Sequence, residues 1–190
     1  MSEYTKYMCL PAAMQVMINM IDDGQADRTR EYQDHLYQLA RTFLIQPCIN
    51  CETGAQPEGW ALALNAEGYG PYEMAIMPTM VEAIHLAAKQ LRLTNKPVGL
   101  LTWRGAHSWA MSGFVSDKDP LLGDDFVVSG VYIEDVWYPR ISSIWGPSDP
   151  PDTLVGMDRL GVDFRKYNRP NQEDPDKDGK WVLIIPVEGN

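Results

Sequence analysis

The spacing of the apolar residues changes once along the chain, and this change constrains the fold more than any other feature. Up to about residue 91, apolar side chains recur at the three- and four-residue spacing of amphipathic helices. From Val98 onward they gather in short runs rich in Val, Ile, Trp and Tyr, which are typical of strands. A helical N-terminal half followed by strands predicts an α+β fold, in which the helices pack on an antiparallel sheet.

Four helices are expected in the first half. The first, over residues 10–23, is apolar on most of its faces, which indicates a buried helix. Pro11 in its first turn and Gly24 at its end are typical of a helix start and a helix stop. The other predicted helices cover residues 27–43, 58–67 and 80–91.

The second half predicts strands joined by polar connections. The expected strands cover residues 98–103, 108–115, 126–137 and 181–187. Residues 139–152 are rich in Pro, Ser and Gly and predict a long surface connection, followed by a short helix near 153–160. Because there is no internal repeat and the length suits one core, we expect residues 1–190 to form a single domain.

The charge of the chain narrows the choice of partners. The formal net charge is −10, and no cluster of Lys and Arg offsets it, so neither nucleic acid nor an anionic membrane surface is an expected partner. No apolar run approaches the roughly 20 residues of a membrane span, and residues 1–7 lack the pattern of a signal peptide. We expect a cytoplasmic location by default, or a leader outside this chain, and the composition leaves the oligomeric state open.

The cysteines do not form a disulfide framework, because there are only three of them. Cys48 and Cys51 make one Cys-x-x-Cys pair, whereas a structural zinc ion needs four ligands and no second pair is present. A local disulfide and two plain thiols are the remaining interpretations of this pair.

Residues 174–179, with the sequence DPDKDG, have the pattern that opens a calcium-binding loop. Ile185 stands where an EF-hand has its last acidic ligand. A solvated turn before the last strand is therefore the better interpretation, and we expect neither a metal ion nor an organic cofactor.

Cys9 begins the first predicted helix, in the string MCLPAA. The positive end of a helix dipole lowers the pKa of a thiol and favours the thiolate, which is the form that attacks carbonyl groups. A buried, unreactive cysteine is the alternative interpretation. Cys9 is thus a candidate nucleophile if a base lies nearby.

His107 follows a glycine-containing turn and begins a predicted strand, in the string GAHSWAMSGF. This position can direct an imidazole at a helix terminus, and a cysteine nucleophile needs such a base within hydrogen-bond reach. A purely structural histidine is the alternative. His35 and His85 fall inside predicted amphipathic helices, where surface positions explain them.

Asp135 lies near the end of a predicted strand, in the string VYIEDVWYP. Strand alternation puts it on the same face as Val131 and Ile133, where a buried carboxylate needs a partner. Orienting the ring of His107 would supply that partner, as the third member of a catalytic triad does. Capping a turn is the alternative role.

The order of these three residues is that of papain-like peptidases. CLPAA opening an apolar helix, HxWxMxGF on a strand and an Asp on the next strand resemble the double-glycine-leader (bacteriocin-processing) type of cysteine peptidase. The chain more closely resembles a group of uncharacterised bacterial proteins related to that type, from about Tyr4 to Val187, including GWALALN at 59–65 and RLTNKPVGLL at 92–101. The resemblance implies a papain-like fold with Cys9 as nucleophile, His107 as base and Asp135 as orienting carboxylate.

One departure concerns the oxyanion. Peptidases of this type usually carry a Gln a few residues before the cysteine, but residues 2–8 read SEYTKYM. An ionised Glu3 accepts hydrogen bonds and cannot donate to an oxyanion, which leaves the N–H of Cys9 and the hydroxyl groups of Tyr4 and Tyr7 as candidate donors. Losing one donor costs on the order of 10²–10³ in rate.

These observations predict a cysteine peptidase or amide hydrolase that acts on a peptide or protein substrate with a Cys-His-Asp triad. The alternative is a catalytically degenerate papain-like domain that binds a peptide or protein partner, which the missing Gln favours. A transferase that uses the same thiol through an acyl-enzyme is a third possibility.

Overall fold

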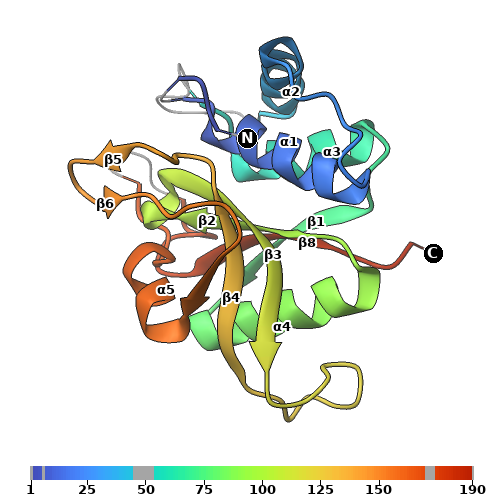
Figure 1. The fold of residues 1–190 in the computed structure, drawn as a ribbon, viewed down its shortest axis with the longest axis vertical. Helices are drawn as coiled ribbons and strands as arrows, with labels where there is room; N and C mark the ends of the chain where they lie inside the picture. The colour runs from blue at the N-terminus through green and yellow to red at the C-terminus, as the bar shows by residue number, and fades with distance from the viewer. Residues whose placement is uncertain (1, 6, 45–53, 170–173, 190) are drawn as a thin grey trace.

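The computed structural model describes residues 2–5, 7–44, 54–169 and 174–189. Its elements in chain order are α1 (Cys9–Ile21), α2 (Arg30–Thr42), α3 (Pro57–Ala66), β1 (Tyr72–Met77), α4 (Met80–Thr94), β2 (Val98–Thr102), the 3₁₀ turn η1 (Trp103–Gly105), β3 (His107–Ser116), β4 (Val128–Asp135), β5 (Ile141–Ser142), β6 (Gly146–Pro147), β7 (Thr153–Gly156), α5 (Met157–Asp163) and β8 (Trp181–Pro186). Figure 1 shows α1, α2 and α3 on one face of a sheet, with α4 and α5 on the other.

The central sheet has six strands in the order β1-β8-β2-β3-β4-β7, and every neighbouring pair is antiparallel. β5 and β6 form a separate small hairpin. The α+β class and the antiparallel sheet, which the change in periodicity predicts, are therefore what the structure shows. The last strand, β8, inserts between β1 and β2, so the C-terminal segment completes the sheet.

Apolar side chains cover both faces of the sheet. On one face, α1 contributes Met14, Met17 and Ile18 to a core that also contains Trp60 of α3. On the other face, Ile84 of α4 lies in a second core with residues of the strands. The methionines of α1 are thus core residues, and α1 is apolar nearly all round because α2, α3 and the sheet surround it.

A polar side chain inside this apolar layer fixes α1 against α2. Gln15 is buried, and its amide nitrogen donates to the carbonyl oxygens of Asp27 and Thr29 at 3.1 and 2.9 Å. Its amide oxygen accepts from the side chain of Gln33 at 2.9 Å. Thr29 in turn caps α2 by accepting from the N–H of Tyr32. Because these groups are mutually satisfied, their burial is tolerated.

The structure differs from the sequence prediction in three segments. Residues 72–77 form β1, which was not predicted because its Met and Ala residues do not favour a strand and its partner β8 is more than a hundred residues away in the chain. The helix expected near 153–160 is instead β7 followed by α5. The connection over 139–152 contains the β5–β6 hairpin.

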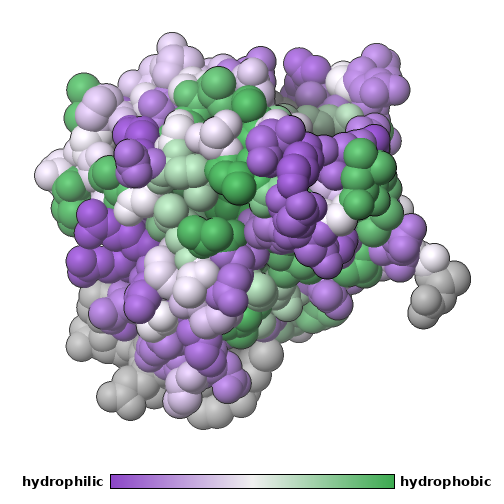
Figure 2. Space-filling view, turned by 90° about the horizontal axis from the view of Figure 1, so that it is seen from below, coloured by the Kyte–Doolittle hydropathy of each residue, from purple (hydrophilic) through white to green (hydrophobic). Residues whose placement is uncertain are grey.

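The surface mixes apolar and polar residues, as the face in Figure 2 shows. The most exposed large apolar side chains are Val81 in α4, Leu122 in the connection from β3 to β4, and Ile141 and Ile144 in the β5–β6 hairpin. Within the described ranges, no helix combines the length and the apolar character that crossing a membrane requires.

Close packing of α3 on α2 gives a test of the fold. A Cβ atom at Gly59 would overlap the carbonyl oxygen of Ala40, whereas a Cβ atom at Gly161 would meet Met80 at an ordinary 3.6 Å. We expect Gly59→Ala to lower the free energy of unfolding by roughly 1–3 kcal/mol because backbone must move. The control Gly161→Ala, in α5, should be neutral or stabilising by up to about 1 kcal/mol. Urea denaturation measures both, and equal effects would contradict the packing described.

Candidate active site

The three residues singled out from the sequence lie together at one end of the sheet. His107 begins β3 and Asp135 ends β4, and antiparallel pairing puts these two positions at the same end, nearest the layer of α1 in Figure 1. Cys9 begins α1, which packs across β3. The Cys9 Sγ atom and a ring nitrogen of His107 lie within 4.8 Å of each other, and an oxygen of the Glu3 carboxyl group lies within the same distance of both.

His107 and Asp135 form a buried hydrogen-bonded pair. Nε2 of His107 lies 2.8 Å from Oδ1 of Asp135, and the two side chains are 2% and 1% exposed. Oδ1 also accepts from the N–H of Trp137 at 2.9 Å, which fixes the carboxylate. A carboxylate in its ionised form only accepts, so this contact assigns the ring proton to Nε2 and leaves Nδ1 without a proton, as a candidate base for the thiol.

Two indole rings hold the imidazole in place. Trp103 stacks on His107 with the ring centroids 4.1 Å apart, and Trp137 meets it edge-on at 6.3 Å. The indole N–H of Trp103 donates to Oδ1 of Asp163 in α5 at 3.0 Å, so the stacking ring is itself anchored. Sequence reasoning missed the role of Trp103, because only the turn brings it back over His107.

The turn that precedes His107 has a strained backbone. Trp103, Arg104 and Gly105 have φ angles of 52°, 60° and 89°. A positive φ is costly for residues other than glycine, on the order of 1–3 kcal/mol each, and such strain is concentrated at functional sites. A Cβ atom at Gly105 would also lie 2.5 Å from the ring of Tyr167. The fold therefore keeps a costly turn where it presents the candidate base.

The environment of Cys9 differs from the sequence expectation. Burial raises the pKa of the Cys9 thiol to about 12, the charge of Glu3 raises it further, and the Ser108 hydroxyl, the Leu10 N–H and Arg169 act in the opposite direction. The prediction that the helix terminus gives Cys9 a low pKa is thus wrong, since burial outweighs the helix dipole. A thiolate at neutral pH would therefore require a base, and the ring of His107, which has a nitrogen within 4.8 Å of Sγ, is the candidate.

Glu3 also differs from its expected state. Its side chain is 1% exposed, its N–H donates to the carbonyl oxygen of Val136 at 2.9 Å, and Oε1 accepts from Arg140 at 3.2 Å. Burial raises the pKa of Glu3 to about 8; the charge of Asp135 acts in the same direction, and the cation of Arg140 opposes both. At neutral pH this raised pKa favours the uncharged form of the carboxyl group, which can donate, whereas the sequence analysis considered only an ionised Glu3.

Tyr4, His35 and His85 lie outside this cluster. The Tyr4 hydroxyl donates to Asp34 of α2, so this candidate oxyanion donor is bound elsewhere, while Tyr7 is 40% exposed. His35 pairs with Glu67 at 2.8 Å, and His85 stacks on Phe126, which are surface positions on α2 and α4 as expected. Sequence reasoning missed Arg140, which contacts Glu3 from the connection after β4.

Glu3, Cys9 and His107 also have the residue types of a metal centre. A metal ion would bind Glu3 and Cys9 in their ionised forms, whereas burial raises the pKa of both groups. Glu3 is in addition hydrogen-bonded to the cation of Arg140. We therefore interpret Glu3, Cys9 and His107 as polar groups gathered around a thiol, in place of a metal centre.

The sequence contains two other patterns with metal-binding residue types, and the structure describes only the second of them. Cys48 and Cys51 lie outside the described residues. Residues 174–179 form a turn, in which Asp174 accepts from the N–H of Lys177 at 3.1 Å and the buried Lys177 ammonium group pairs with Asp174 and Glu58. The carboxylates of Asp174 and Glu58 are thus engaged with Lys177.

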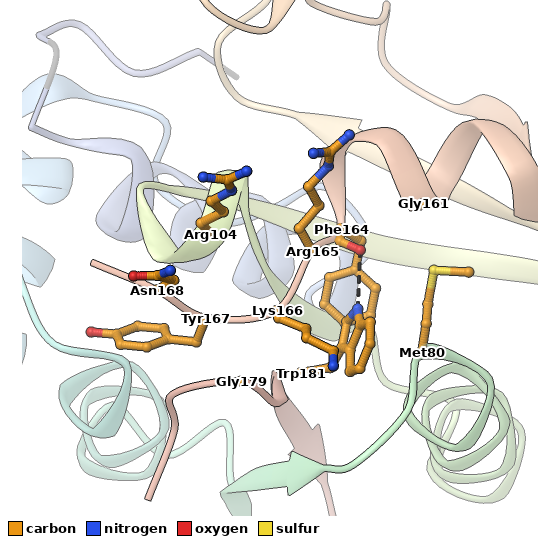
Figure 3. Close-up of a pocket in the computed structure, with 10 residues that line it drawn as sticks. All are labelled: Met80, Arg104, Gly161, Phe164, Arg165, Lys166, Tyr167, Asn168, Gly179 and Trp181. Atoms are coloured by element: carbon orange, nitrogen blue, oxygen red, sulfur yellow. Dashed lines mark hydrogen bonds between the residues drawn. The ribbon is translucent and has the colours of Figure 1, made fainter. Parts of the chain in front are cut away.

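A cavity of about 610 Å³ lies beside the strained turn. Figure 3 shows the guanidinium groups of Arg104 and Arg165 above it, and the ring of Trp181, whose N–H donates to the carbonyl oxygen of Phe164 at 3.1 Å, below them. Arg165 also lies over Trp145, which stacks on Trp103. The full lining is Met80, Arg104, Gly161, Phe164, Arg165, Lys166, Tyr167, Asn168, Gly179 and Trp181.

Comparison with protein-family profiles, with curated proteins and with solved structures gave no match. The functional argument therefore depends on the geometry and chemistry of the residues around Cys9.

The ionisation of Glu3 gives a test based on stability. With a pKa of about 8 in the folded chain against 4.5 for an ordinary Glu, the native state holds a proton that the unfolded state has lost between these values. Stability from this group is thus present at low pH and falls as the pH rises through that window. Replacing Glu3 by Gln removes this loss. The difference in free energy of unfolding between Glu3→Gln and the wild-type chain should therefore shift by roughly 1–3 kcal/mol in favour of the variant from pH 5 to pH 8. Urea denaturation at the two pH values tests this; a constant difference would contradict it.

Proposed function

We propose that this chain is a cysteine hydrolase of peptide or related amide bonds, with a papain-like fold and a triad of Cys9, His107 and Asp135. The observation that carries the proposal is the buried His107–Asp135 hydrogen bond within reach of the Cys9 thiol. A thiol, an imidazole and a carboxylate in this sequence of contacts are the parts that nucleophilic catalysis by cysteine requires.

The first half of the reaction transfers an acyl group to Cys9. The Cys9 thiol proton moves to Nδ1 of His107, the sulfur forms a bond with the carbonyl carbon, and the C=O electron pair moves to the oxygen. When this oxyanion re-forms the carbonyl group, the C–N bond breaks and the leaving amine takes the proton from His107. Asp135 stabilises the imidazolium ion that exists between these two proton transfers.

The second half regenerates the thiol. A water molecule gives a proton to His107 while its oxygen attacks the thioester carbon, and the C–S bond breaks as the carbonyl group re-forms. The carboxylic acid leaves, and the sulfur recovers its proton from the imidazolium ion. Because the thiol has a raised pKa, His107 is needed as a base in acylation and as an acid at this last step.

Two features of the fold support the papain-like assignment. The nucleophile candidate begins a buried helix that packs on the sheet, and the base and carboxylate candidates lie on adjacent antiparallel strands in the same chain order as in that class. The strained turn at Trp103 and Arg104 is a further sign that the position of His107 has a function beyond packing.

The alternative proposal is a degenerate papain-like domain that binds a peptide or protein partner without turnover. The absence of Gln from residues 2–8 favours it, because a Gln amide is a donor at any pH. The two proposals differ in one measurable property, which is whether His107 controls the reactivity of Cys9.

The test is the rate at which iodoacetamide alkylates Cys9 as a function of pH, followed by mass spectrometry of the peptide that contains it. If His107 accepts the thiol proton, we expect wild-type Cys9 to react below about pH 8, where a plain thiol is mostly protonated. His107→Ala should then lower the rate at about pH 7 by tenfold or more, since the thiol loses its base.

His85→Ala is the matched control, because His85 is a surface histidine that stacks on Phe126, away from Cys9. It should leave the labelling rate unchanged. If wild-type Cys9 reacts only above about pH 8 and His107→Ala changes nothing, the dyad does not exist and the hydrolase proposal fails.

A further inference from the structure

We propose that the uncharged carboxyl group of Glu3 donates a hydrogen bond to the oxyanion that forms when Cys9 attacks a carbonyl group. This inference rests on the proposed function and assigns a fourth residue to it. It would give the site a donor in the segment where Gln is absent, and it would confine efficient acyl transfer to the pH range in which this carboxyl group keeps its proton.

The position of Glu3 fits this role. One of its carboxyl oxygens lies within 4.8 Å of both Cys9 Sγ and a ring nitrogen of His107. A carbonyl carbon bonded to Sγ would place its oxygen close to the sulfur, between the carboxyl group and the start of α1. The first N–H groups of a helix have no intrahelical partner, so the N–H of Cys9 can point at the same oxygen. Two donors on one developing charge are what such a site needs.

The two oxygens of Glu3 have different surroundings. Oε1 accepts a hydrogen bond from Arg140 at 3.2 Å. Oε2 is buried and has no hydrogen-bond partner among the described residues. An unmade hydrogen bond on a buried polar atom is costly, and such atoms in native structures call for a ligand or a water molecule. In an uncharged carboxyl group, Oε1 as the carbonyl oxygen accepts from Arg140 and Oε2 as the hydroxyl donates.

The charges around Glu3 decide when it can donate. Asp135 at the end of β4 and the thiolate form of Cys9 on α1 disfavour its ionisation, while Arg140 favours it. His107 faces it from β3, and Arg28 and Arg30 line the same cavity as Glu3 on the side of α2. Burial outweighs the nearby cations and raises the pKa of Glu3 to about 8. Donation is therefore present below that pH and is lost as the pH rises through it.

Glu3 is distinguished from the rest of the site by comparing two reactions of the same thiol. Acylation of Cys9 by p-nitrophenyl acetate forms an oxyanion, whereas alkylation by iodoacetamide displaces iodide at a saturated carbon and forms none. Both reactions consume the thiolate, so the ratio of their rates cancels the ionisation of Cys9 and His107. The rates are measured in the presence of EDTA, and ester hydrolysis by the Cys9→Ser protein is subtracted.

For the wild-type chain, we expect the ratio of acylation to alkylation to fall by about tenfold or more from pH 6 to pH 9.5, as Glu3 loses its proton. Glu3→Gln should keep a high ratio that does not change with pH, because an amide donates in either range. Glu3→Met, which has a similar shape and no donor, should give a ratio about 10²-fold lower at pH 6.

Arg140→Met supplies a second, independent measurement. Arg140 stabilises the ionised form of Glu3, so its removal should move the fall in the ratio to higher pH. The same substitution made together with Glu3→Gln should have no effect on the ratio. This arm remains informative if Glu3→Met fails to fold.

The outcomes separate the two proposals. If the ratio is independent of pH in the wild-type chain, or falls equally in Glu3→Gln, Glu3 is not the donor, although His107-dependent alkylation of Cys9 would still support the hydrolase. If alkylation does not depend on His107, the hydrolase proposal itself fails. A ratio that falls with pH in wild type alone, and that shifts in Arg140→Met, supports both.

Discussion

The pairing of β3 with β4 is the constraint on which the candidate site depends. Trp109 lies opposite Asp135 in this register, so His107, two residues earlier, lies beside the turn that follows β4. The 2.8 Å hydrogen bond between His107 and Asp135 exists only in this register. A slip of one residue would turn Asp135 to the opposite face of the sheet and leave its buried charge without the imidazole. The apolar neighbours of Asp135 on its strand, Val131 and Ile133, oppose such a slip because both are buried.

Burial sets the protonation states of Cys9 and Glu3, and it acts against the electrostatic effects of the α1 dipole and of the Arg140 cation. The start of α1 offers a positive dipole end to Cys9, and Arg140 offers a cation to Glu3, and either would favour an anion in water. In the interior, desolvation raises the pKa of Cys9 to about 12 and that of Glu3 to about 8. The cluster thus holds two acids with raised pKa values beside the Asp135 carboxyl group, which is hydrogen-bonded to His107 and accepts from the N–H of Trp137.

The sequence carries enough information to predict the first four helices and the strands β2, β3, β4 and β8. It also indicates the three residues that the structure brings together, because each lies at the end of an element with clear periodicity. Two kinds of feature depend on contacts distant in the chain. β1 exists as a strand through its pairing with β8, and its own sequence mixes residues that favour a strand, such as Tyr72 and Ile76, with residues that do not, such as Glu73 and Ala75. The uncharged state of Glu3 follows from its burial against Val136 and Arg140, which no local pattern near residue 3 could indicate. Trp103 reaches His107 only because the backbone turns through three positive φ angles.

These observations are linked by one constraint, which is that a buried cluster disfavours two negative charges close together. When Cys9 transfers its proton to His107, a thiolate and an imidazolium ion form as a pair, and the net charge of the cluster does not change. An ionised Glu3 would add a second anion within 4.8 Å of the sulfur, and in a buried environment two like charges so close raise each other's pKa. A neutral Glu3 avoids that repulsion, and it keeps a proton that can be directed at the oxyanion, to which the charge of the thiolate moves as the C–S bond forms. The burial that makes the thiol a weak acid therefore also prepares its neighbour as a donor, so both effects have the same physical origin.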